Sequence, residues 1–155
     1  MADPAQLLAA VAALAAAASA GIYHVFHATV MPSLAGGPPV VASATMRTIN
    51  KRIVRTGFMP LFLGSGVLAL GSCLVAPLVA EPLALPMAAA GALYLFGSIG
   101  VTMMGNVPLN RRLDSAPTAD VDAWNRFAPR WCRLNLVRTI ASLLAALVWI
   151  AVAIA

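Results

Sequence analysis

The sequence predicts an all-α integral membrane protein, a four-helix transmembrane bundle that forms a single domain over residues 1–155. Composition is the first observation, because 61% of the residues are hydrophobic and only 10% are charged, whereas soluble domains carry about 25% charged residues. The second is the presence of four apolar runs, each near the roughly 20 residues that a helix needs to cross the hydrocarbon core. The third is the confinement of all ten Lys and Arg residues to two windows, 47–55 and 111–138.

The four apolar runs are the predicted transmembrane spans. They cover residues 7–31, 57–80, 83–105 and 129–155. Pro108 is expected to end the third helix soon after its span, because proline removes a hydrogen bond from a helix interior and clashes with the preceding turn. Pro129 fits the first turn of the fourth helix, where the N–H group that proline lacks would have no partner.

Two connecting segments are also predicted to be helical. In residues 41–55, Arg47, Lys51 and Arg55 share one face while apolar side chains such as Met46 point the other way. This pattern is typical of an amphipathic helix lying in the membrane interface, and the alternative is a short solvated connector. Residues 118–128 suit a second short helix, with Thr118 or Asp120 as its N-cap.

The distribution of positive charge predicts the orientation. The basic windows fall between spans one and two and between spans three and four, while both termini and the turn at residues 81–82 lack Lys and Arg. By the positive-inside rule, both basic loops face the cytoplasm of a cell (inner) membrane and both termini lie outside. Apolar runs bound each basic window, so we expect the lipid bilayer as partner and no nucleic acid. The sequence does not decide whether the chain forms a homo-oligomer.

Polar side chains on three spans are predicted to reach one depth, the cytoplasmic third of the bundle. His24 and His27 lie towards the cytoplasmic end of the first span. Thr102 and Asn106 share a face of the third span because they are four residues apart. Asn110 follows at the membrane edge.

The fourth span adds a polar stripe with spacings of four, three and four, formed by Trp131, Asn135, Arg138 and Ser142. Arg138 lies nine residues after Pro129, which is about 13 Å along a helix. A charged group at such a depth is costly unless it faces the bundle interior or a wet cavity. We therefore expect the two histidines to share a pocket with Asn106, Asn135 and Arg138.

Each of these residues also has a structural explanation. A histidine near a helix end can bond a backbone carbonyl, and Asn106 can cap the third helix. Arg138 can extend its guanidinium to lipid phosphates, and Trp131 can belong to the aromatic belt of the interface. Their common depth favours a shared site.

Four segments resemble the anthrone oxygenase-like family of small integral membrane proteins. They read GIYHVFHATVMPSL, MRTINKRIV, GVTMMGNVPLNRRL and RWCRLNLVRT, in that order, and the resemblance extends from Gly21 to the last span. It implies an oxidoreductase, a monooxygenase that oxidises anthrones to anthraquinones with dioxygen and requires no organic cofactor. The positions that match are His24 or His27, Asn106, Asn110, Trp131, Asn135 and Arg138.

From this resemblance and from the shared faces and depth of the polar side chains, we assign roles to nine residues. The catalytic set is His24, His27, Asn106, Asn135 and Arg138, and the substrate-binding set is Thr102, Asn110, Trp131 and Ser142. A neutral histidine can remove the acidic proton next to an anthrone carbonyl. The arginine and the amides can stabilise the enolate oxygen. The electron-rich anion can then react with dioxygen, between apolar walls that hold a small aromatic substrate.

Two other classes of function stay open, so the sequence leaves open whether the chain is an enzyme. One is a haem- or metal-binding redox protein with His24 or His27 as ligand. Because both histidines are on one helix, they cannot bind opposite faces of one haem, and a single axial histidine with an open distal side is expected instead. The other is a non-enzymatic membrane carrier or assembly protein.

Overall fold

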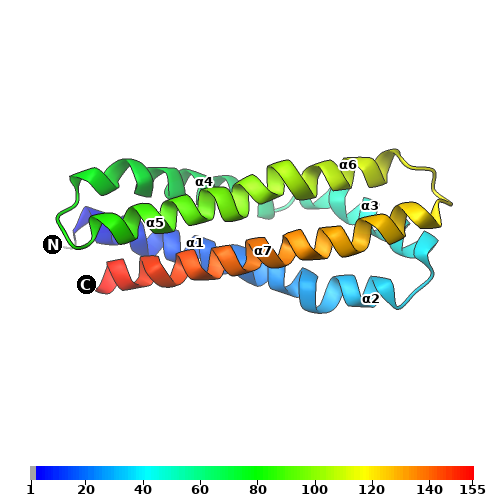
Figure 1. Ribbon diagram of the computed structural model, residues 1–155, viewed down its shortest axis with the longest axis horizontal. Helices are drawn as coiled ribbons and strands as arrows, with labels where there is room; N and C mark the ends of the chain where they lie inside the picture. Colours follow the sequence, from blue (N-terminus) through cyan, green and yellow to red (C-terminus); the bar gives the residue numbers. More distant parts are fainter. Residues whose placement is uncertain (1–2) are drawn as a thin grey trace.

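The computed structural model describes residues 3–155. Four helical stretches are long and apolar enough to cross a membrane, namely Pro4–Ala35, Phe58–Leu78, Ala84–Ser115 and Val121–Ile154. The predicted all-α, four-helix fold is therefore confirmed, and the chain is a multi-pass membrane protein. The two ends of the chain lie at one end of the bundle, and the connections α2–α3 and α6–α7 lie at the other (Figure 1).

Three of these stretches contain changes of helix type. The first joins α1 (Pro4–Val25), a π-helical turn (Phe26–Val30) and α2 (Met31–Ala35). The second joins α4 (Phe58–Val75) to a 3-10 turn (Ala76–Leu78). The third runs from α5 (Ala84–Tyr94) through π-helical turns at Leu95–Gly100 and Thr102–Asn106 into α6 (Val107–Ser115). The fourth is one helix, α7 (Val121–Ile154), and α3 (Pro39–Ile53) connects the first two stretches.

Aspartate side chains cap two of the long helices. Asp3 Oδ1 accepts a hydrogen bond from the Ala5 N–H at 3.0 Å, and Asp120 Oδ1 accepts one from the Ala123 N–H at 2.9 Å. Such caps satisfy N–H groups that have no partner within the helix. Of the two caps predicted for the segment before the fourth span, Asp120 is the one used.

Two prolines do not mark helix boundaries, which corrects the predicted end of the third helix and the predicted start of the fourth. The third stretch continues past Pro108 to Ser115, and α7 passes through Pro129. Pro108 lies in the first turn of α6, directly after a π-helical turn that already interrupts the regular ladder, so its missing N–H is tolerated. Before Pro129, the buried side chains of Trp124 and Phe127 hold the helix in place.

The predicted helix between spans one and two is present as α3. Its buried residues Ala42 and Met46 pack against apolar side chains of α6 and α7. On the other side, Arg47 donates to the backbone carbonyls of Asp114 and Ala116 at 3.1 and 2.9 Å. Lys51 pairs with Asp114 at 3.2 Å. These contacts bind α3 to the end of α6, and its position in the membrane interface stays a prediction.

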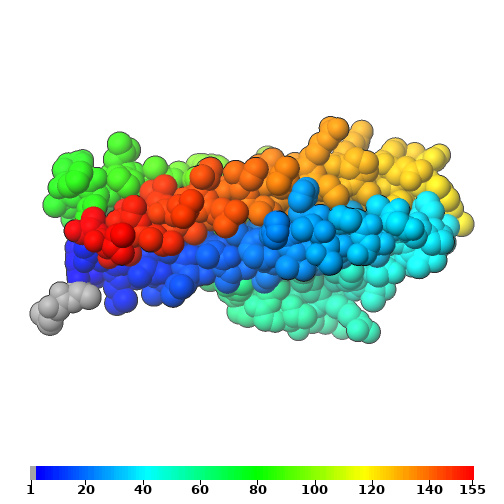
Figure 2. All heavy atoms as spheres, turned by 90° about the horizontal axis from the view of Figure 1, so that it is seen from below, coloured from blue at the N-terminus to red at the C-terminus, as the bar shows by residue number. Residues whose placement is uncertain are grey.

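The interior contains two large apolar clusters that are separated along α7. One packs small residues of α1 against α7 near the chain ends and includes Tyr94 and Trp149. The other lies at the basic end and includes Trp124, Phe127 and Trp131. Figure 2 shows α1 (blue) beside α7 (orange to red) along one face. The part of α7 between the clusters carries the buried polar residues of the candidate site.

Close helix packing depends on glycine where α4 meets α5. A Cβ atom at Gly91 would lie 2.6 Å from both the backbone oxygen of Ala69 and the Sγ of Cys73. Small residues of this kind let transmembrane backbones approach each other. The outer faces carry exposed large apolar side chains, such as Val67 and Phe96, as expected for a lipid-facing surface.

Candidate functional site

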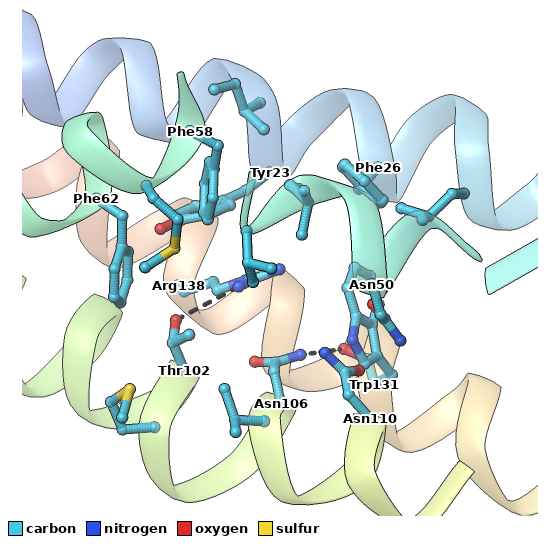
Figure 3. Close-up of a pocket in the computed structure, with 17 residues that line it drawn as sticks. Tyr23, Phe26, Asn50, Phe58, Phe62, Thr102, Asn106, Asn110, Trp131 and Arg138 are labelled. Atoms are coloured by element: carbon cyan, nitrogen blue, oxygen red, sulfur yellow. Dashed lines mark hydrogen bonds between the residues drawn. The ribbon is translucent and has the colours of Figure 1, made fainter. Parts of the chain in front are cut away.

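A cavity of about 260 Å³ lies between the helices on the basic side of the bundle (Figure 3). Most of its wall is aromatic or aliphatic, and side chains from the first three helical stretches, α3 and α7 contribute to it. The polar lining residues are Tyr23, Asn50, Thr102, Asn106, Asn110, Trp131 and Arg138. The volume is close to the lower end of the roughly 300–1,000 Å³ typical of small-molecule sites.

Arg138 is the charged group of this cavity, and only 6% of its surface is exposed. Its Nε and Nη2 atoms both donate to Asn135 Oδ1, at 3.0 and 2.8 Å. Its Nη1 atom donates to Thr102 Oγ1 at 3.4 Å (Figure 3). The guanidinium therefore has a fixed orientation, and N–H groups remain for a further acceptor because a guanidinium carries five.

No carboxylate within residues 3–155 pairs with Arg138. The side-chain ion pairs found there are Lys51–Asp114 and Arg126–Asp120. Instead, the guanidinium carbon lies 4.2 Å from the centroid of the Tyr23 ring and 5.2 Å from that of Trp131. Aromatic faces attract a cation without neutralising it. A buried, uncompensated positive charge beside an apolar cavity is suited to an anionic ligand or to negative charge that develops during a reaction.

Asn135 forms hydrogen bonds both to Arg138 and to the neighbouring helix α1. Its Nδ2 donates to the backbone carbonyl of Tyr23 at 2.8 Å, and the residue is fully buried. Tyr23 lies just before the π-helical turn Phe26–Val30, and such turns disturb the regular backbone ladder and are frequent at functional sites. Asn135, which orients the arginine, therefore binds the first helical stretch three residues before this irregular turn.

Amide and indole groups line the other polar end of the cavity. Asn106 Nδ2 donates to the backbone carbonyl of Trp131 at 3.4 Å. Within residues 3–155, four buried polar atoms there have no hydrogen-bond partner, namely Asn50 Nδ2, Asn106 Oδ1, Asn110 Oδ1 and Trp131 Nε1. Leaving such groups unpaired is costly away from water, so this end is suited to a ligand group or water that both donates and accepts hydrogen bonds.

The structure brings most of the predicted polar residues together. Thr102, Asn106, Asn110, Trp131 and Arg138 line the cavity, as Figure 3 shows. Asn135 lies behind Arg138 and contacts it directly. Ser142 is fully buried but does not line the cavity, because it lies one turn beyond Arg138 towards the chain ends. Its predicted contact with substrate is not supported by this position.

The two histidines lie outside the pocket that was predicted to contain them. His24 is exposed and His27 is partly buried, with an Nδ1 atom that has no partner within residues 3–155. Neither lines the cavity. The buried face of α1 follows Ala9, Ala16 and Tyr23, and His24 is rotated about 100° from Tyr23 because it is the next residue on the helix. The expectation that both imidazoles share a pocket with Arg138 is wrong.

Sequence reasoning missed Tyr23 and Asn50. Tyr23 is almost completely buried, and its hydroxyl accepts a hydrogen bond from Ser98 at 3.4 Å. The sequence contained a signal for Tyr23, because this residue continues the row of small residues on the buried face of α1. Asn50 comes from α3, and only the packing of α3 over the cavity reveals it.

Binding of a metal ion by His24 or His27 would require further ligand side chains nearby. Within residues 3–155, no group of three or more His, Cys, Asp or Glu side chains could hold a metal ion. The haem alternative requires an imidazole that faces a space large enough for a porphyrin. Because neither histidine lines the cavity, the cavity and the histidines do not form one haem site.

The sequence matches a family of known proteins. The family model described as anthrone oxygenase matches residues 51–148, a narrower range than the resemblance from Gly21 onwards. Seven of the nine predicted site residues fall inside the matched range, from Thr102 to Ser142, and the two histidines lie outside it. No curated protein and no solved structure matches significantly. Because the matching range covers more than half of the chain, this protein belongs to the anthrone oxygenase family.

Proposed function

We propose that this protein is a membrane-embedded oxidoreductase that oxidises a flat, apolar aromatic substrate of the anthrone type with dioxygen. Membership of the anthrone oxygenase family supports the reaction class. The observation that carries the proposal is Arg138, a buried cation without a carboxylate partner at the wall of an apolar cavity. Such a cation stabilises the enolate that an anthrone forms when it loses a proton.

The substrate's carbonyl oxygen binds the free N–H groups of Arg138, near the Thr102 hydroxyl. Asn135 fixes the guanidinium in advance, so little reorganisation is needed when negative charge develops on that oxygen. Phe58 and Phe62, which stack at 5.7 Å between ring centroids, and Tyr23 form flat walls for the aromatic rings. The amide end of the cavity receives a second polar group of the substrate or a water molecule.

The reaction balances with dioxygen and water alone. The CH₂ carbon of the anthrone loses a proton to water, and the electron pair is delocalised onto the carbonyl oxygen next to Arg138. The enolate gives one electron to dioxygen, and the resulting radical and superoxide combine into a hydroperoxide after protonation. Loss of water from the hydroperoxide leaves the second carbonyl, so CH₂ and O₂ become C=O and H₂O. The protein's own task is to bind, orient and stabilise the anion.

Histidine is not used as the base in this proposal, since neither imidazole lines the cavity. Among the residues that the structure describes, no carboxylate lines the cavity either. We infer that the proton leaves to water at the open rim, and that stabilisation of the enolate makes a stronger base unnecessary. The proposed reaction uses no organic cofactor and no metal ion.

Substrate reaches the cavity from the lipid side. Two of the lining residues are exposed, Val54 directly after α3 at 54% and Met103 in the third helical stretch at 55%. An anthrone partitions into the bilayer because it is apolar, so an opening between apolar side chains is a suitable route. We further infer that the basic end of the bundle faces the cytoplasm of the cell membrane, which rests on the positive-inside rule.

Oxygen uptake by the purified protein with an anthrone tests the proposal. The wild type should consume dioxygen and form the anthraquinone, and Arg138→Gln should lower kcat about 100- to 1,000-fold, the usual loss on removing an oxyanion donor. Arg111→Gln is the matched control, since Arg111 is exposed and does not line the cavity. A Soret band in the purified protein would support the haem alternative instead. Anthrone binding without turnover would support a carrier.

A further inference from the structure

Six of the ten cationic side chains make no hydrogen bond or ion pair within residues 3–155. Arg47, Lys51, Arg126 and Arg138 have the partners already described. The remaining six are Arg52, Arg55, Arg111, Arg112, Arg130 and Arg133, and all are exposed. Three of these six converge on one groove, so their free charge is concentrated in space.

That groove lies between the third helical stretch and α7. Its lining includes apolar side chains and three arginines, Arg112, Arg130 and Arg133. The groove has a volume of about 380 Å³. The other lining residues are Met104, Gly105, Pro108, Leu109 and Leu134. The groove is separate from the cavity of Arg138, because Met103 lines the cavity whereas Met104 lines the groove.

We propose that this groove binds an anionic phospholipid, with the phosphate headgroup at Arg112, Arg130 and Arg133. Basic pockets between transmembrane helices are suited to anionic headgroups, and arginine pairs with phosphate in a bidentate manner. The inference is independent of the proposed oxidation.

The surface beside the arginines fits an acyl chain. Val137 and Leu144 follow Arg130 and Arg133 along the same face of α7, and both are exposed. On the other wall, Met104 is among the most exposed large apolar side chains. Charged groups at the end of an apolar strip match a lipid, in which a charged head precedes a hydrocarbon tail. A soluble phosphate would gain nothing from the apolar floor.

The floor of the groove is shaped by a close helix contact. A Cβ atom at Gly105 would lie 2.7 Å from Leu134 Cδ1, so the glycine allows Leu134 to pack against the third stretch. This contact brings Arg130 and Arg133 of α7 to the same opening as Arg112. The three positive charges are therefore held at one opening by helix packing.

The test compares two variants that lose the same charge. Delipidated protein is titrated with phosphatidylglycerol or phosphatidylcholine in detergent micelles, and bound lipid is counted by native mass spectrometry. Wild type should retain phosphatidylglycerol in preference to phosphatidylcholine. Arg112→Gln/Arg130→Gln/Arg133→Gln should lower phosphatidylglycerol affinity about 100-fold. The control is Arg52→Gln/Arg55→Gln/Arg111→Gln. Its affinity for phosphatidylglycerol should stay within about threefold of wild type, because the three charges that it removes are spread widely.

Each other outcome overturns the proposal. Equal losses in both variants would mean a diffuse attraction to the whole basic end. Equal retention of the two lipids by wild type would remove headgroup recognition. Competition by inorganic phosphate at the same concentration as the lipid would show a site for free anions. Should the groove variant unfold, the preference of wild type for phosphatidylglycerol and its resistance to phosphate still decide the matter.

Discussion

Replacing Asn135 by aspartate is a sharp test of the uncompensated charge on Arg138. The substitution keeps the size and shape of the side chain, and it leaves an oxygen 2.8–3.0 Å from Nη2 and Nε of Arg138. It converts the neutral partner of the guanidinium into a carboxylate. It also removes the amide that donates to the carbonyl of Tyr23 at 2.8 Å.

The size of the effect follows from the geometry. Two opposite charges about 4 Å apart attract with about 4 kcal/mol at an effective dielectric constant of about 20. An aspartate at position 135 would therefore compete with the substrate enolate for the same cation at all times. The oxyanion stabilisation should be largely lost, which corresponds to a fall in kcat of about 100- to 1,000-fold.

Oxygen uptake with an anthrone measures this effect. Asn135→Asp should fall to the level of Arg138→Gln, and the double variant should be no slower than either single one, because both changes remove the same interaction. Asn125→Asp is the matched control, since Asn125 is an exposed residue of α7 outside the cavity. A folded Asn135→Asp variant with wild-type turnover would refute the role given to the charge of Arg138.

Three further predictions concern the histidines, the helix packing and the orientation. His24→Ala and His27→Ala should each keep kcat within about threefold, since neither side chain lines the cavity; a large loss in steady-state oxygen uptake would return histidine to the mechanism. Gly91→Ala should destabilise the protein by about 1–3 kcal/mol through overpacking against the Ala69 carbonyl, whereas Gly64→Ala, where a Cβ meets nothing within 4 Å, should unfold like wild type in a thermal melt. Reporter fusions at the C-terminus should be active on the outer side of the membrane only, and cytoplasmic activity would reverse the inferred orientation.

Much of the fold could be predicted because bilayer thickness constrains it strongly. Four apolar runs of suitable length predicted four helices, and the spacing of Arg47 and Lys51 predicted α3. The continuation past Pro108 could not be predicted, because it depends on a π-helical turn in the preceding residues. Such a turn is set by tertiary packing and has no signature in local composition.

The candidate site was predicted in part. Depth and helical spacing brought Thr102, Asn106 and Arg138 to one level, and the structure places all three at one cavity. The rotation of α1 was predicted wrongly, because two polar rings were given more weight than the row of small residues that ends at Tyr23. Asn50 could not be predicted as a site residue, because its position at the cavity depends on how α3 folds back over the bundle.

The central claim is that the cavity stabilises an oxyanion next to Arg138, and it can be tested without turnover. A spectrophotometric pH titration of anthrone bound to the protein under anaerobic conditions follows the coloured enolate directly. In wild type, half of the bound anthrone should ionise about 1–2 pH units lower than in Arg138→Gln, which corresponds to one charge-assisted hydrogen bond. Ionisation at the same pH in both proteins would contradict the claim.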